Sequence, residues 1–361
     1  MTIRALAAQR LHHQRLLGPP LPTPADVVGW LGAVQSQDYH GAKWGLAQRT
    51  AGATDADLDR LFDGGAILRL HAMRPTWHFV LPEDVRWLQA LTAPRVHAMN
   101  GSMYRKLALD EATLKRGHAL MARALEGGAY RTRAELADAL EAGGIPARGQ
   151  RLAYLVMHAE LDALVVSGPR RGKQFTYALL DERVAPAPAL PRDEALALLT
   201  RRYFASHGPA TVADYRWWSG LTAADARTGI EAVEGELSRV EMDGKMYWTP
   251  TSGPSVSLDA PALHLLPNYD EHVVAYRDHG PSLDPQAPGA LAGWGTALTA
   301  HLVVRDGLVV GGWRRTVEKR NVTVTTDLLA PLDEAERAAL EAAANAYGRF
   351  LGLPVRVEAR A

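Results

Sequence analysis

The sequence contains no cysteine. This excludes disulfides, cysteine nucleophiles, iron–sulfur clusters and thiolate zinc sites. Thirteen histidines are left as possible metal ligands, but they are dispersed, and no HExxH motif or comparable helical pair occurs. The sequence therefore predicts neither a metal site nor a cofactor.

Long apolar runs are also missing. No segment approaches about 18 uninterrupted apolar residues, so no transmembrane helix is expected. The first residues, MTIRALAAQRLHHQRLL, interrupt their apolar positions with arginine and histidine, whereas a signal peptide needs a continuous apolar stretch. We expect a cytoplasmic protein with no membrane partner.

Charge of one sign is not in excess, because 40 basic and 40 acidic residues give a formal net charge of zero. Nucleic-acid-binding domains often carry net positive charge, but the local field on one face decides the interaction. The basic residues do gather in three places. These are Arg69 with Arg74, then Arg170 with Arg171 and Lys173, and finally Arg314, Arg315, Lys319 and Arg320.

The 361 residues exceed one typical domain, and a degenerate internal repeat divides them. Within Tyr130–Leu180 a capped helix follows Thr132 and a second helix covers Gln150–Leu161. Two short strands, Leu164–Val166 and Gln174–Leu179, then flank a basic turn. This is the order of a winged helix-turn-helix.

The same order recurs at Arg201–Thr249, where Asp243-Gly244 predicts a tight hairpin. A looser copy covers Thr23–Leu81. The repeat predicts winged-helix units at 1–115, 116–185 and 192–255. The proline-rich stretch 185–191 and the Ser/Pro/Gly stretch 249–261 are the expected linkers.

Beyond residue 261 the pattern changes to short strands followed by an alanine-rich helix over Asp333–Phe350. The expected strands are Leu263–Leu266, His301–Val304, Leu308–Trp313 and Asn321–Thr326. The predicted fold class is therefore α+β, with three tandem winged helix-turn-helix units plus a C-terminal β-rich domain, 261–361, that carries a terminal helix. Arg314–Arg320 is expected to form a basic hairpin tip.

Two glutamines, Gln35 and Gln37, follow the first expected helix. A helix from about Pro24 would bury Val27, Val28, Leu31 and Val34 on one face. If that helix ends near Gln35 and the chain extends, the two amide side chains can converge on one point. Neutral amides supply neither a base nor a nucleophile, so on the residues alone solvated or backbone-bound glutamines remain the commoner outcome.

A resemblance to a known family favours a catalytic role for the two glutamines. The stretches VQSQDYHGAKWGLAQRT and LRLHAMRPTWHFVLPED, together with LLPNYDEHVVAYRD and VVRDGLVVGGWRR downstream, resemble the AlkZ-like bacterial family of winged-helix DNA glycosylases. The resemblance spans essentially the whole chain. That family uses a Gln-x-Gln catalytic motif, which Gln35 and Gln37 match, whereas a related YcaQ-like branch has Gln-x-Asp.

The resemblance implies a monofunctional glycosylase that hydrolyses the N-glycosidic bond of N7-alkylated purines, and that is able to unhook interstrand crosslinks. Its partner would be double-stranded DNA containing alkylated bases, bound by a monomer. The alkylated base is already a good leaving group, so positioned amide oxygens can suffice to hold a water and stabilise an oxocarbenium-like sugar. No lysine stands out as a nucleophile, so no lyase step is expected. The three basic groups would contact phosphates in an open groove lined by the winged-helix units.

Two other functions stay open. Three winged helices could form a non-enzymatic transcriptional regulator, and Asp270 with Glu271 could serve a hydrolase acting on a small substrate. For these two carboxylates we favour hydrogen bonds across a domain junction. Trp217 and Trp218 are expected in the core. Packing beneath the site is the expectation for Trp44, Trp77 and His78.

Overall fold

The computed structural model describes residues 1–361 except 188, 253–255, 257, 259, 284–299 and 360–361. It forms two compact units. Unit 1 comprises Met1–Leu58, Ala197–Trp218 and Ala226–Ala361, and unit 2 comprises Asp59–Leu196 and Ser219–Asp225. Within the described residues, no helix is long and apolar enough to cross a membrane. Parts of both expected linkers, 185–191 and 249–261, lie outside the described residues, and so does part of the expected C-terminal domain.

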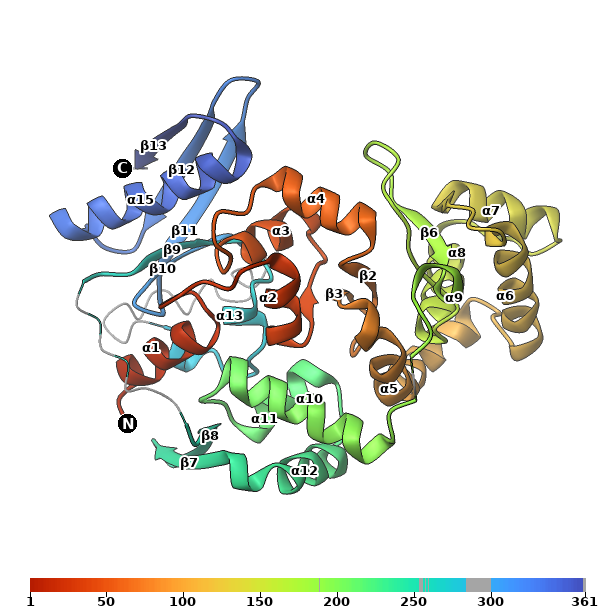
Figure 1. The fold of residues 1–361 in the computed structure, drawn as a ribbon, viewed down its shortest axis with the longest axis horizontal. Coiled ribbons are helices and arrows are strands. Elements are labelled where there is room, and N and C mark those ends of the chain that lie inside the picture. The colour runs from red at the N-terminus through yellow and green to blue at the C-terminus, as the bar shows by residue number, and fades with distance from the viewer. Residues whose placement is uncertain (188, 253–255, 257, 259, 284–299, 360–361) are drawn as a thin grey trace. The chain divides into compact units, whose positions relative to one another are not determined.

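Unit 2 contains a winged helix in one contiguous stretch. Its elements are α6 (Glu111–Leu125), β4 (Arg131–Thr132), α7 (Arg133–Ala142), α8 (Gly149–Leu161), β5 (Val165–Ser167) and β6 (Thr176–Leu179), which Figure 1 shows grouped together. The sheet order is β4-β6-β5, with antiparallel pairs. Thr132 and Glu135 form the expected capping box of α7. Leu136, Leu140, Leu152 and Leu155 pack in one apolar cluster beneath the helices, and the helices and strands expected in this repeat are present in the expected order.

The remaining elements of unit 2 flank this winged helix. They are most of α4 (Asp55–Gly64), the antiparallel pair β2 (Leu68–His71) and β3 (Trp77–Val80), the 3-10 turn η1 (Pro82–Asp84), α5 (Val85–Lys106) and α9 (Leu180–Arg183). The strands β2 and β3 lie near the end of the looser copy that was expected over Thr23–Leu81.

The other two regions contain the helices and strands of the predicted repeats together with additional elements. The first has α1 (Ile3–His13), α2 (Pro24–Leu31), β1 (Val34–Gln35) and α3 (Tyr39–Ala47) ahead of α4. The third has α10 (Arg192–His207), α11 (Val212–Ser219), α12 (Ala223–Ala232), the short η2 (Glu234–Glu236), β7 (Leu237–Met242) and β8 (Lys245–Pro250). Asp243 and Gly244 both adopt positive φ, 50° and 70°, between the paired strands β7 and β8. The predicted Asp-Gly hairpin is thus confirmed.

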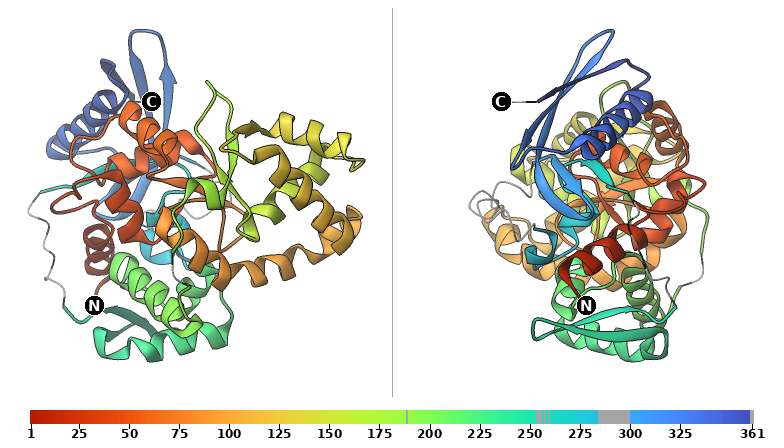
Figure 2. Two further views of the ribbon diagram at one scale, coloured as in Figure 1. Left: turned by 45° about the vertical axis from the view of Figure 1, so that its right-hand side comes forward. Right: turned by 90° about the vertical axis from the view of Figure 1, so that its left-hand side faces the viewer.

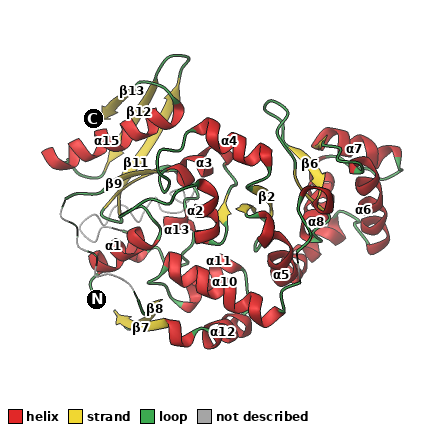
Figure 3. Ribbon diagram, viewed as in Figure 1, coloured by secondary structure: helices red, strands yellow, loops and turns green. Residues whose placement is uncertain are grey.

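The C-terminal part of unit 1 is the strand-rich region, as Figure 3 shows. Its elements are β9 (Leu263–Leu266), α13 (Glu271–Val274), η3 (Gly280–Ser282), β10 (Leu302–Arg305), β11 (Leu308–Val317), β12 (Val322–Leu328), α15 (Glu334–Leu351) and β13 (Val355–Ala359). The sheet order is β13-β12-β11-β10-β9, and only β12 with β13 is parallel. The α+β class and the terminal helix are confirmed.

One boundary prediction in this region is wrong. The strand β11 continues to Val317, so Arg314 and Arg315 pair with Thr325 and Val324 in the sheet. Only Lys319 and Arg320, of the predicted basic tip, lie in the turn between β11 and β12. Trp313, Arg315 and Val317 lie on one face of β11 and alternate with residues on the other face, as in any extended strand. The strands β11 and β12 form the long hairpin seen in Figure 2.

Candidate active site

The Gln35–Gln37 segment lies between two helix ends. Gly32 takes φ +83° and ends α2 after Leu31, because only glycine adopts this conformation without strain. Val34 therefore lies on β1 and not on the helix, although it is buried as expected. Asp38 is the N-cap of α3, and its Oδ1 accepts from the Gly41 N–H at 3.1 Å.

The Glu271 side chain fixes the backbone at the first glutamine. Its Oε1 accepts from the Gln35 N–H at 2.7 Å, and its Oε2 accepts from the Trp218 indole at 3.0 Å. The His207 Nε2 lies 3.4 Å from the same Oε2. Glu271 is only 1% exposed, so these charge-assisted contacts form away from water and hold the segment firmly.

The neighbouring Asp270 is bound by a buried arginine. Arg49 Nη1 and Nη2 donate to its two carboxylate oxygens at 2.9 and 2.7 Å. Burial raises the pKa of Asp270, but the charge and hydrogen bonds of Arg49 outweigh burial and leave that pKa below its usual value. Arg49 Nε also donates to the Gln14 carbonyl at 2.9 Å. Arg49 thereby links the start of α13 to the ends of α1 and α3.

The two glutamines differ in exposure. Gln35 is 6% exposed, whereas Gln37 is exposed and immediately precedes the capped helix. The rigid backbone at Gln35 therefore leads directly to an amide that solvent and ligands can reach. Convergence of the two side chains stays a prediction.

A polar group surrounds the start of α3. A Cβ on Gly41 would lie 2.8 Å from Asp38 Oδ2 and 3.1 Å from Asn268 Oδ1, so a larger residue would force these side chains to move. The Asn268 N–H donates to His301 Nδ1 at 3.0 Å, and Arg315 Nη1 lies 2.9 Å from His301 Nε2. Burial and the nearby Arg315 charge lower the pKa of His301 to about 4, against an opposing effect of Asp38. These contacts therefore link Arg315 through His301 to Asn268, and His301 stays neutral near pH 7.

The other residues expected near the site are mostly packed. Trp44 is buried, donates to the Leu265 carbonyl at 2.7 Å and contacts Tyr347 and Phe350. Trp218 is fully buried, as predicted. Trp217 is 44% exposed, so its core assignment was wrong; its indole donates to the Val274 carbonyl at 3.0 Å. A helix that buries Trp218 must turn the adjacent residue away by about 100°.

In unit 2, His78 is fully buried, and burial with the charge of Arg74 lowers its pKa to about 3. Trp77 is partly buried beside His71.

The basic residues of unit 2 differ in availability. Arg69 is 8% exposed and lies over the rings of Trp77 and Phe175. Arg170 pairs with Asp59 at 2.5 Å, and its backbone N–H donates to Asp63. A phosphate contact by either arginine would require it to leave these partners. Arg171 is exposed and pairs with Glu135 at 2.8 Å, Lys173 is exposed in the same turn, and Arg74 is half-buried.

The basic residues of the β11–β12 hairpin lie in unit 1. Arg314, Lys319 and Arg320 are exposed, and Arg315 is half-buried beside His301. Glu318 shares the turn, so the hairpin end carries two cations and one anion.

Sequence reasoning missed the roles of Arg49 and Gln14. A buried arginine is an unusual residue that signals a partner, but nothing in the sequence marks Arg49 as buried.

Comparisons with known proteins agree with the fold. The family model described as "DNA glycosylase AlkZ-like" matches residues 28–350. An interstrand DNA cross-link repair glycosylase of Streptomyces sahachiroi is 26% identical over 382 residues, covering 98% of each chain. The solved structure of the Streptomyces sahachiroi DNA glycosylase AlkZ has a TM-score of 0.81 and 24% identity, and covers 99% of each chain. Because the family model matches most of its length, the chain belongs to the AlkZ-like family of DNA glycosylases.

Proposed function

We propose that this DNA glycosylase releases N7-alkylated purines, including purines joined in interstrand crosslinks, and that Gln35 and Gln37 are its catalytic residues. The observation that carries the proposal is the contrast between a backbone fixed at Gln35 by Glu271 and an exposed amide at Gln37. The cross-link repair named for the Streptomyces relative supports the crosslink substrate.

The chemistry fits neutral amides. Alkylation at N7 makes the purine a cationic leaving group, so the bond to C1′ breaks without strong acid catalysis. The enzyme then has to hold one water and present partial negative charge to the oxocarbenium-like sugar. A glutamine oxygen on a rigid backbone does this without the reorganisation that a mobile side chain would require. The released base and an intact abasic site are the products, with no lyase step.

The proposed DNA contacts follow from the exposure of the cations. Lys173 and Arg171 extend from the wing of the middle winged helix and suit phosphate contacts. Arg314, Lys319 and Arg320 on the β11–β12 hairpin suit a contact in or beside a groove. Arg69, Arg74, Arg170 and Arg315 are retained as proposed contacts with a lower contribution, because each is wholly or partly buried. The protein would bind double-stranded DNA as a monomer.

Base release tests the proposal directly. An oligonucleotide with a single N7-methylguanine is incubated with the wild type, Gln35→Ala, Gln37→Ala and the control Asn345→Ala, which removes an exposed amide from α15. We expect abasic-site formation to collapse in both glutamine variants while DNA affinity and the control's rate persist. Full base release by Gln37→Ala would contradict the catalytic assignment. Release from methylguanine but not from a crosslinked duplex would contradict the crosslink substrate alone.

The two rival functions are less well supported. Membership of a glycosylase family argues against a purely regulatory DNA-binding protein. A hydrolase using Asp270 and Glu271 would need accessible carboxylates, but both are buried and bound to Arg49, to the Gln35 backbone and to Trp218.

A further inference from the structure

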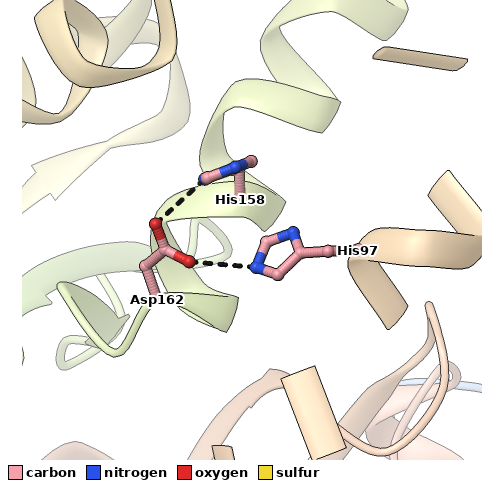
Figure 4. A group of neighbouring side chains, drawn as sticks. All are labelled: His97, His158 and Asp162. Carbon is pink, nitrogen blue, oxygen red and sulfur yellow. Dashed lines mark hydrogen bonds and ion pairs between the residues drawn. The ribbon is translucent and has the colours of Figure 1, made fainter. Parts of the chain in front are cut away.

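Three histidines that are far apart in the sequence come together on unit 2. His97 lies on α5, His118 on α6 and His158 on α8, and Asp162 is the residue that ends α8. His97 Nε2 lies 2.9 Å from Asp162 Oδ1, and His158 Nδ1 lies 3.3 Å from Asp162 Oδ2. Figure 4 shows both imidazoles directed at the same carboxylate. The dispersed positions explain why the sequence predicts no metal site.

We propose that His97 Nε2, His158 Nδ1 and the Asp162 carboxylate bind one divalent transition-metal ion of the zinc class. One ligand atom from each of the three residues lies within 4.8 Å of the others. In a tetrahedral zinc site the bonds are about 2.0–2.1 Å long, so neighbouring ligand atoms lie about 3.3 Å apart. The Asp162 oxygens lie 2.9 Å from His97 Nε2 and 3.3 Å from His158 Nδ1, which is close to that spacing.

The chemistry of the donors selects this class of ion. Two imidazoles and a single carboxylate suit Zn²⁺, Co²⁺ or Ni²⁺, whereas Mg²⁺ and Ca²⁺ prefer all-oxygen sites. His97 also has a fixed orientation, because its Nδ1 lies 2.9 Å from the Tyr104 hydroxyl. A hydrogen bond to the second ring nitrogen is the usual support of a metal-binding histidine.

The position of Asp162 gives a second, independent reason. It is the C-cap of α8, where the unpaired carbonyls of the helix end disfavour a carboxylate. A cation beside this carboxylate offsets that unfavourable interaction, and an ion held with His97 and His158 would supply one.

The ion would join two helices. His97 belongs to α5, while His158 and Asp162 belong to the end of α8, and the adjacent apolar contact between these helices is small: Ala93, Val96, Met157 and Leu161. A metal bridge beside this contact would stabilise the packing of α5 on the winged helix. His118 lies next to the group, with its Nε2 3.1 Å from His158 Nδ1, but it is not one of the three assigned ligands.

Cobalt binding tests the site. The full-length protein, without a histidine tag and stripped with a chelator, is titrated with Co²⁺ and followed by visible absorption and calorimetry. We expect one equivalent to bind with the absorption of a four- or five-coordinate ion, and Zn²⁺ to displace it and raise the melting temperature. His97→Ala, His158→Ala and Asp162→Asn should each weaken binding by about 100-fold or more, since each removes a direct ligand of the ion.

The control is His12→Ala, which removes a partly exposed histidine from α1 in unit 1 and should bind cobalt as the wild type does. Circular dichroism of the metal-free variants separates lost binding from lost folding. Absence of stoichiometric binding by the wild type, or equal binding by the folded His97→Ala variant, would overturn the proposal. Asp162 would then be only the hydrogen-bond acceptor of the two imidazoles.

Discussion

The Gln35 segment and the middle winged helix are stabilised in different ways. Charged groups that are distant in sequence fix the Gln35 segment: Glu271 binds a backbone N–H 236 positions away, and Asp270 binds Arg49. The winged helix of unit 2 rests instead on a local capping box at Thr132 and on a contiguous apolar cluster. The candidate catalytic segment therefore depends on a few buried charges, whereas the wing-bearing module depends on many weak, local contacts.

Removal of the buried cation should have the largest effect on stability. Arg49→Met leaves Asp270 buried without its partner, which costs about 3–5 kcal/mol of folding free energy in such pairs. The control Arg148→Met breaks an exposed pair with Glu141 on the winged helix and should change stability little. Urea unfolding followed by tryptophan fluorescence measures both. Equal losses in the two variants would remove the contrast between the regions.

The same pair predicts a dependence on pH. The folded pKa of Asp270 is lowered from its usual value, so its stabilising contribution is complete above the unfolded pKa of about 4 and is lost as pH falls through the lower, folded pKa. The stability gap between the wild type and Arg49→Met should therefore narrow in acid. Urea midpoints measured from pH 7 down to pH 3 check this, and a gap that widens toward acid would contradict the assigned sign.

A smaller loss is expected at the start of α3. A methyl group in Gly41→Ala would lie 2.8 Å from Asp38 Oδ2, so the carboxylate must move and the cap of α3 is weakened, at about 1–2 kcal/mol. Because Gln37 directly precedes Asp38, the rate of base release should also fall, and by more than the small loss of folded protein would explain. Gly101→Ala is the control: its Cβ meets nothing nearer than 3.6 Å inside α5, and it should gain about 0.5–1 kcal/mol. Unchanged base release in a folded Gly41→Ala variant would separate the α3 cap from catalysis.

The contrast also explains how much the sequence alone could predict. In the middle repeat the cap at Thr132, the helix over Gln150–Leu161 and both strands lie within 50 residues, so local patterns sufficed. The turn at Asp243-Gly244 could also be predicted, because an Asp-Gly pair between two strands is enough to indicate a tight hairpin. The contact of Glu271 with Gln35 was not, because no local pattern links positions so far apart.

Several long helices escaped prediction for reasons visible in their sequences. The helix α5 carries Pro94 inside it, and proline in a helix normally marks an end. In α10 the polar residues Thr200, Ser206 and His207 are fully buried, so the apolar periodicity that identifies a helix is interrupted. The exposure of Trp217 was not predicted, because the large apolar surface of a tryptophan favours burial. Adjacent helix positions point in different directions, however, and only Trp218 faces the core.

Loss of the local cap should cost less than loss of the buried charges. Thr132→Ala removes the acceptor of the Glu135 N–H and should destabilise unit 2 by about 1 kcal/mol. Thr132→Ser keeps the hydroxyl and serves as the control. Thermal unfolding by circular dichroism gives the shift, and base release at a temperature below the transition should be unchanged. A loss as large as that of Arg49→Met would show that the winged helix, too, depends on single contacts.

The smallest expected effect concerns DNA affinity. Lys173 is exposed in the wing turn, and Lys115 is an exposed lysine on α6. If Lys173 contacts a phosphate, Lys173→Gln should weaken binding to any duplex and reduce the slope of log affinity against log salt by about 0.9, the value for one released counterion. Lys115→Gln should leave the slope unchanged.

Fluorescence anisotropy over a salt series measures both, with lesion-containing and intact duplexes in parallel. Equal weakening on the two duplexes fits a phosphate contact, because phosphates carry no information about the base. Weakening confined to the lesion duplex would assign the wing to lesion recognition instead. The wing and the Gln35 segment would then share a role in lesion recognition, although the stability variants are expected to show that they are stabilised in different ways.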